Sequence, residues 1–227
     1  MEWGGFFCGN VKKKIDQRRK SELTKVMKLL KRLGAFTLIE LLVVISIIAI
    51  LASLALPAIT GALTRGQASQ TMSNARQLYV ATFNMAADGQ TTGDTNLVWP
   101  GDSGSPSWST WATGLTTGGY LSTNDFNKML NAQGVSRPAN TAPTAATPSA
   151  LSVYQVKDSS PMQAIFVSSA NFVNPGTALL PAALPFGAKA FVVMRRGGDG
   201  LVYQGAQATN STLFFDTVYT TLDTKLQ

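Results

Sequence analysis

The chain has 227 residues, enough for one domain of ordinary size, and a formal net charge of +7. It has no histidine, and its single cysteine is Cys8, so histidine-based catalytic triads, histidine-ligated zinc sites and an intrachain disulfide are excluded. Residues 1–35 carry ten Lys or Arg against three Asp or Glu, whereas residues 36–227 carry nine of each. The basic character therefore belongs to the N-terminal segment.

Residues 1–35 are predicted to be a basic cytoplasmic leader, because positive charge beside a membrane helix stays on the cytoplasmic side. The run KKKIDQRRK also fits a nucleic-acid patch, but the topology rule accounts for the charge, and we expect no nucleic-acid partner. The stretch from Met27 to Ala35 would form a complete leader on its own. This predicts that translation begins at Met27.

Residues 36–57 are predicted to form the membrane-spanning half of a long helix. No charged residue occurs from Leu41 to Thr64, and about 20 apolar residues suffice to cross a bilayer. Glu40 stands at the entrance of this run, where a carboxylate near hydrocarbon costs on the order of a few kcal/mol unless it is paired. A cleaved secretory signal is one alternative, but the run exceeds a typical signal core and begins with an acid. An ordinary signal anchor is the other alternative.

Residues 58–88 are predicted to be an amphipathic continuation of the same helix. Pro57 lacks a backbone donor and should kink the helix, and Asp88-Gly89 should end it. Apolar residues recur mostly at three- and four-residue steps, at Ile59, Leu63, Met72, Ala75, Leu78, Tyr79, Phe83 and Ala86.

Residues 89–227 are predicted to be the exported globular region. Its first part, residues 89–123, is rich in Gly, Thr, Ser and Asp, which indicates a loop that packs through Trp99, Trp108 and Trp111. The alternative for the three tryptophans is carbohydrate binding.

A short helix is expected between Ser122 and Gln133, capped by Thr123 or Asn124. Its inner side would carry Phe126, Met129 and Leu130. Residues 136–149 contain three prolines among Ala and Thr and are predicted to be a linker or exposed loop.

From Leu151 the pattern favours strands, and Gly197-Gly198-Asp199-Gly200 is typical of a tight hairpin turn. Asn174-Pro175-Gly176 is predicted to be another turn. The β-rich segments are residues 151–156, 163–170, 189–196, 201–206 and 212–219. Together they predict an antiparallel sheet of about four strands, packed against the amphipathic half of the helix in an α+β fold.

The segment Ala35-Phe36-Thr37-Leu38-Ile39-Glu40-Leu41-Leu42-Val43-Val44 resembles the prepilin signature of type IV pilins and type II secretion pseudopilins. The resemblance implies a pilin-like fold, cleavage before Phe36 by a prepilin peptidase and methylation of the new amine. With Phe36 as the first residue, Glu40 is fifth and Pro57 twenty-second, the family's positions for both. Cleavage after Gly34 would make Glu40 sixth, which favours the bond between Ala35 and Phe36.

The resemblance further implies a structural subunit rather than an enzyme. Its partners would be the prepilin peptidase, other subunits, an inner-membrane assembly platform and the bilayer. In a filament, Glu40 of one subunit would meet the Phe36 amine of the next. The absence of cysteine after Cys8 favours a secretion pseudopilin over an adhesion or motility pilin. A membrane-anchored protein that binds glycans through the tryptophan-rich loop is the alternative from another class.

The expected location is the inner membrane, crossed once, with the N-terminus cytoplasmic and the C-terminal region periplasmic or extracellular. No cofactor is expected. Asp199 is a weak candidate for the calcium site that the resemblance suggests, but the loop lacks a series of acidic ligands, which favours a turn residue. Asp216 and Asp223 are isolated acids.

Overall fold

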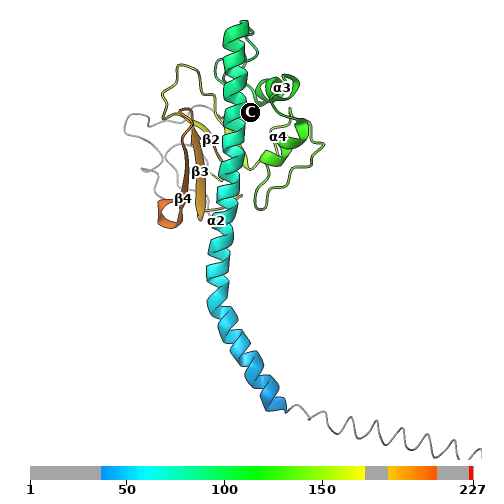
Figure 1. The fold of residues 1–227 in the computed structure, drawn as a ribbon, viewed down its shortest axis with the longest axis vertical. Helices are drawn as coiled ribbons and strands as arrows, with labels where there is room; N and C mark the ends of the chain where they lie inside the picture. The colour runs from blue at the N-terminus through cyan, green and yellow to red at the C-terminus, as the bar shows by residue number, and fades with distance from the viewer. Residues whose placement is uncertain (1–36, 172–183, 209–224, 227) are drawn as a thin grey trace, which may run out of the picture. The chain divides into compact units, whose positions relative to one another are not determined.

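The computed structural model describes residues 37–171, 184–208 and 225–226. It divides into two compact units, an N-terminal unit (Met1–Leu56) and a C-terminal unit (Pro57–Gln227). Helix α2 (Leu38–Thr92) runs from one unit into the other over 55 residues (Figure 1). The predicted long helix is therefore confirmed.

Helix α2 ends four residues later than Asp88-Gly89 predicted. Gly89 lies inside the helix, where the backbone of Leu97 occupies the space that a Cβ would need. The helix stops at Gly93, which adopts φ 75° and donates its N–H to the Gly89 carbonyl at 2.8 Å. A glycine in this left-handed conformation is a common helix terminator. Gly89 thus allows the Leu97 backbone to pack closely against the helix, and Gly93 ends the helix.

The buried face of α2 differs from the face that apolar residues predicted. Ala75, Leu78 and Ala86 are buried as expected. By contrast, Ile59, Leu63 and Phe83 are more than half exposed, so placing them on the buried face was wrong. The buried residues of α2 are Ala68, Thr71, Asn74, Ala75, Leu78, Ala81, Thr82, Met85, Ala86 and Gly89. Most are small, and small side chains let the rest of the C-terminal unit approach the helix backbone closely.

Four strands form an antiparallel sheet in the order β1-β2-β3-β4, which confirms the predicted sheet and the α+β class. They are β1 (Leu151–Val153), β2 (Ile165–Ser169), β3 (Ala190–Arg195) and β4 (Gly200–Gln204), followed by a short 3₁₀ helix, Gly205–Gln207. Each strand pairs with the next along the chain. The predicted turn at residues 174–176 and strand at residues 212–219 lie outside the described residues.

Helix α3 (Trp108–Thr117) lies in the region predicted to be a loop, so that prediction was wrong for these ten residues. The Ser107 side chain caps the helix by accepting the Thr110 N–H at 3.1 Å. One face carries the buried residues Trp108, Trp111, Ala112 and Leu115. Their spacing is helical, and the tertiary burial of this face outweighs the weak helix propensity of the surrounding Gly and Thr.

Helix α4 (Thr123–Met129) confirms the predicted short helix but covers only part of the predicted range. Its cap is Ser122, not Thr123 or Asn124, and the Ser122 hydroxyl oxygen accepts the Asp125 N–H at 3.1 Å. The three residues predicted for the inner side, Phe126, Met129 and Leu130, are buried.

The main hydrophobic core joins α2, α3, α4 and the sheet within the C-terminal unit. Figure 1 shows this part of α2 between the sheet and the two short helices. At its centre Phe166 lies edge-on to Trp99 with ring centroids 5.5 Å apart, and Trp111 lies edge-on to Phe126 at 5.7 Å. A smaller cluster around Phe186 extends the packing toward Ala68 on α2.

Candidate functional site

The first part of α2 is an apolar surface that no described part of the chain covers. An 18-residue window of this helix has a mean hydropathy of 2.8 and no buried residue. Polar groups inside the run are satisfied locally: the Ser46 hydroxyl donates to the Leu42 carbonyl at 2.7 Å, and Ser53 to Ile50 at 2.8 Å. Such internal bonding is what a hydrocarbon environment requires. This helix is long and apolar enough for a single-pass anchor.

The Glu40 carboxylate folds back onto the start of its own helix. Its Oε2 atom accepts the Thr37 N–H and the Thr37 hydroxyl, both at 2.8 Å. In return, the Thr37 hydroxyl oxygen accepts the Glu40 N–H at 3.2 Å. This reciprocal arrangement is a capping box. Thr37 therefore offsets part of the cost of the Glu40 charge before any external partner binds.

The capping box leaves capacity for a second partner. Both bonds from Thr37 reach Oε2, and within residues 37–171 the Oε1 atom accepts no hydrogen bond. A carboxylate offers about four acceptor positions, so a cation could bind Oε1 without breaking the cap. The sequence signal for this cap was the T-x-x-E spacing before an apolar run, which the sequence analysis missed.

Pro57 lies within α2 and begins the C-terminal unit. It has no N–H to donate to the Ser53 carbonyl, while its own carbonyl accepts the Thr60 hydroxyl at 3.0 Å. The kink expected here remains a prediction. Gly34, Ala35 and Phe36 lie outside the described residues, so cleavage between Ala35 and Phe36 also remains a prediction.

The three tryptophans are anchors of the core. Trp99, Trp108 and Trp111 are each only 3% exposed. The Trp108 indole donates to the Pro143 carbonyl at 2.9 Å, and the Trp111 indole donates to the Thr82 hydroxyl at 3.1 Å. The expectation that this region packs through its aromatics is confirmed. Because their rings are covered, these tryptophans offer no open face for a sugar to stack on.

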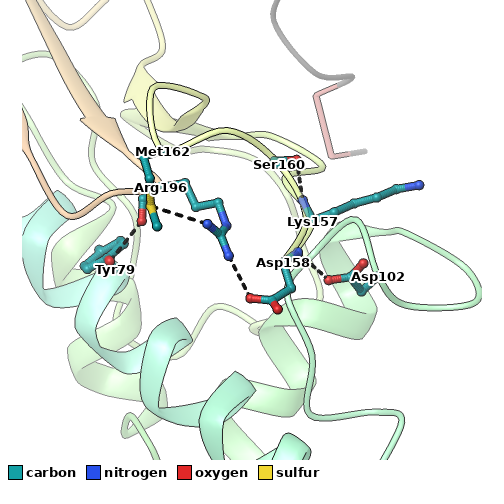
Figure 2. Close-up of polar contacts among 7 residues, drawn as sticks. All are labelled: Tyr79, Asp102, Lys157, Asp158, Ser160, Met162 and Arg196. Carbon is teal, nitrogen blue, oxygen red and sulfur yellow. Dashed lines mark hydrogen bonds and ion pairs between the residues drawn. The ribbon is translucent and has the colours of Figure 1, made fainter.

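Arg196 holds three chain segments together beside the sheet (Figure 2). Its guanidinium forms an ion pair with Asp158 at 2.7 Å and lies 5.6 Å from the Trp99 ring centroid. The Tyr79 hydroxyl of α2 donates to the Arg196 carbonyl at 2.9 Å, and burial raises the Tyr79 pKa. The Asp102 carboxylate accepts the Asp158 N–H at 2.6 Å. These contacts fix the loop between β1 and β2 against the helix and the tryptophan region.

Asp199 occupies the β3–β4 hairpin, as its Gly-rich surroundings predicted. Its carboxylate pairs with Arg195 at 3.1 Å, and the neighbouring Gly198 adopts φ 87°. Among the described residues, no three Cys, Asp or Glu side chains lie close enough together to hold a metal ion. Asp216 and Asp223 lie outside the described residues.

A buried arginine organises the proline-rich segment at residues 136–149, so the prediction of a linker or exposed loop was wrong for this residue. Arg137 is 3% exposed. Its guanidinium donates to the carbonyls of Ala142, Ala145 and Pro148 at 2.8–3.1 Å. Burial lowers the Arg137 pKa. Neutral carbonyls thus fix the segment to the core, and no spacing in the sequence indicated this.

Comparison with known proteins identifies a family model that matches part of the chain. Residues 30–56 match the family model described as the prokaryotic N-terminal methylation motif. This motif is the signature of type IV pilins and pseudopilins, so the resemblance stated from the sequence is confirmed for this segment. No curated protein and no solved structure matches the chain.

Proposed function

We propose that this protein is a structural subunit of a type II secretion-like or type IV pilus-like filament, and specifically a pseudopilin. A prepilin peptidase cleaves before Phe36 and methylates the new amine. The processed subunit stays in the inner membrane, with the C-terminal unit on the periplasmic side, until an assembly platform adds it to the filament.

One observation carries this proposal: the methylation motif coincides with the uncovered apolar part of a helix that continues into a folded unit. Large apolar side chains from Leu38 to Leu56 are at least 46% exposed. Lipid can cover them before assembly, and neighbouring apolar helices can cover them afterwards. A signal peptide or simple anchor needs no such continuity between the apolar helix and the folded unit.

Glu40 supplies the register between subunits. After cleavage, the Phe36 amine of one subunit meets Glu40 of its neighbour in an apolar bundle. The free Oε1 atom is the acceptor, while Oε2 stays bonded to Thr37. Head-to-tail contacts of this kind do not close on themselves, so they generate an open helical fibre.

The choice of a pseudopilin rests on the exported part of the chain. It has no cysteine, whereas pilins commonly close a C-terminal disulfide loop. The C-terminal unit is instead held by its aromatic core and by the Arg196 and Arg137 contacts. An adhesion or motility pilin is the competing possibility.

The test is mass spectrometry of the chain purified from cells with and without a prepilin peptidase. We expect a mature N-terminus at Phe36, with one added methyl group, only when the peptidase is present. Cleavage by a signal peptidase after the apolar run, or an intact N-terminus in both cells, would refute the proposal. Sheared filaments that contain the processed chain would support the assembly step.

A further inference from the structure

A cleft with a mixed polar and apolar lining opens on the C-terminal unit where the chain continues from the apolar run. It is about 450 Å³ in volume and lies between α2 and the β3–β4 side of the sheet. The α2 side contributes Pro57, Thr60, Thr64 and Arg65. Lys189, just before β3, and Gln204, at the end of β4, face them. The cleft thus brings two cationic side chains to one concave surface.

Those two cations differ from the others that the same sheet carries. Arg195 and Arg196 are paired with Asp199 and Asp158. By contrast, neither Arg65 nor Lys189 forms an ion pair with any residue in the described ranges, and both are exposed. The cleft is therefore a positively charged surface available to an anion from outside this part of the chain.

Helix geometry places Arg65 at a particular depth. The hydrocarbon core is about 30 Å thick and a helix rises about 1.5 Å per residue, so about 20 residues cross it. If crossing starts at Leu41, the start of the charge-free run, it ends near residue 60, and Arg65 follows about 7.5 Å later. The polar layer on each side of the core is about 5–7.5 Å deep. Arg65 thus falls at the outer edge of the lipid headgroup layer.

We propose that this cleft binds the headgroup of an anionic phospholipid in the outer leaflet, with Arg65 and Lys189 on the phosphate. The inference rests on the membrane anchoring in the proposed function. The Gln204 amide can add a neutral donor. Lipid binding here would hold the C-terminal unit at the membrane surface until the subunit is extracted.

The lining favours a headgroup that carries hydroxyls, such as phosphatidylglycerol. Thr60 and Thr64 already donate their hydroxyl protons to helix carbonyls, at 3.0 Å each, so their oxygens remain acceptors. A glycerol headgroup donates to such oxygens while its phosphate faces the two cations. An acidic side chain would satisfy the cations but would offer the threonines no donor.

The experiment is native mass spectrometry of the full chain released from nanodiscs of phosphatidylcholine mixed with phosphatidylglycerol. We expect the wild type to retain phosphatidylglycerol selectively. The double variant Arg65→Gln/Lys189→Gln should lose that retention about tenfold or more, because each cation near an anionic surface contributes to attraction. The matched control is Arg76→Gln/Lys157→Gln, which removes two exposed cations outside the cleft and should retain lipid like the wild type.

Four outcomes would overturn the inference. The first is a wild type with no preference for phosphatidylglycerol, and the second is a control pair that loses as much lipid as the cleft pair. Displacement of the lipid by millimolar inorganic phosphate is the third, and it would assign the cleft to free phosphate. Lysine-to-carboxylate crosslinks between chains through Lys189, formed equally with or without anionic lipid, would assign it to a second copy of this chain. A chain that fails to enter any nanodisc would instead refute the proposed membrane anchoring.

Discussion

The N-terminal and C-terminal parts of helix α2 differ in how far their apolar side chains are covered. Between Leu38 and Leu56 the large apolar side chains are 46–80% exposed, whereas Leu78 and Met85 in the second part are at most 1% exposed. The first part has the bulky residues and no described cover. The second part has small residues and a full core around it.

Because of this difference, we expect the C-terminal part of α2 to contribute to folding and the N-terminal part to contribute to assembly. The C-terminal unit buries its own apolar surface and therefore has an internal source of stability. No described residue covers the apolar part of the N-terminal unit, and in the proposed function its cover comes from lipid or from other helices. Changes in the first region should therefore affect insertion and assembly, and changes in the second should affect unfolding.

The largest effect should come from Glu40→Val. Insertion should remain intact, because removing an acid lowers the cost of entering hydrocarbon. Filament yield should fall about tenfold or more, because leaving one partner of a buried ion pair unpaired costs about 3–5 kcal/mol. The yield of sheared filaments, with membrane fractionation beside it, measures both expectations.

Thr37→Val is the matched control for this substitution. It removes the hydroxyl of the capping box but keeps the carboxylate. We expect a much smaller loss of filaments, because the Glu40 charge can still pair with a neighbouring amine. If both variants lost filaments equally, Glu40 would serve only to cap its own helix. Normal yield with Glu40→Val would refute the pairing mechanism altogether.

The next effect tests whether the C-terminal unit folds independently. A fragment of residues 61–227 should be soluble and monomeric, and Phe166→Ala should lower its free energy of unfolding by about 3–5 kcal/mol. Phe166 is fully buried, with ring contacts to Tyr79, Trp99 and Trp111. Urea unfolding followed by tryptophan fluorescence provides the measurement.

Phe83→Ala is the matched control, since Phe83 is 51% exposed but also touches Tyr79 and Trp99. Its cost should be about 1 kcal/mol, the usual contribution of an aromatic pair. Aggregation of the unmodified fragment would show that the C-terminal unit depends on the apolar segment.

Features with a strong local signal were predictable from the sequence. The charge-free run, the spacing of Phe36, Glu40 and Pro57, and the Gly-rich hairpin around Asp199 each combine a composition rule with a position rule. The four strands were predictable because β-branched and aromatic residues are concentrated in them. These features need no knowledge of distant contacts.

Features set by distant contacts were not predictable. Helix α3 forms because Trp111 reaches Thr82 on α2 and Phe126 on α4. The composition of residues 89–123, rich in Gly, Thr, Ser and Asp, indicated a loop instead of a helix. Arg137 is buried because carbonyls 5–11 residues further along its own segment surround it, and no spacing rule indicates this arrangement. The Thr37–Glu40 cap differs from these, because its T-x-x-E spacing is a local signal that the sequence carries.

A smaller effect should follow from the Arg196 contacts in the C-terminal unit. Arg196→Met should lower the free energy of unfolding by about 1–2 kcal/mol, because it removes both the ion pair and the contact with the Trp99 ring. Asp158→Asn should cost about 0.5–1 kcal/mol, since Asp158 is half exposed. Urea unfolding of the two single variants and the double variant gives the coupling energy. Strictly additive losses would show that the ion pair contributes nothing.

The smallest effect concerns Tyr154 and depends on pH. Burial raises the pKa of the Tyr154 hydroxyl, which forms a 2.9 Å hydrogen bond with Ser168. Below pH 10, the ordinary tyrosine pKa, both folded and unfolded chains keep the proton, so this contribution to stability is complete. Above it the unfolded chain releases the proton first, and stability falls by at most about 1.4 kcal/mol per pH unit.

Tyr154→Phe isolates this contribution from the other tyrosines. At pH 8 the variant should be less stable than the wild type by about 1 kcal/mol, the usual net value of a hydrogen bond. As the pH rises through 10 and beyond, the difference should shrink and then reverse, because phenylalanine has no proton to release. Urea unfolding of the fragment 61–227 at a series of pH values follows both curves. A difference that stayed constant across the series would mean that Tyr154 ionises as easily in the folded chain as in the unfolded one, which its burial against Ser168 contradicts.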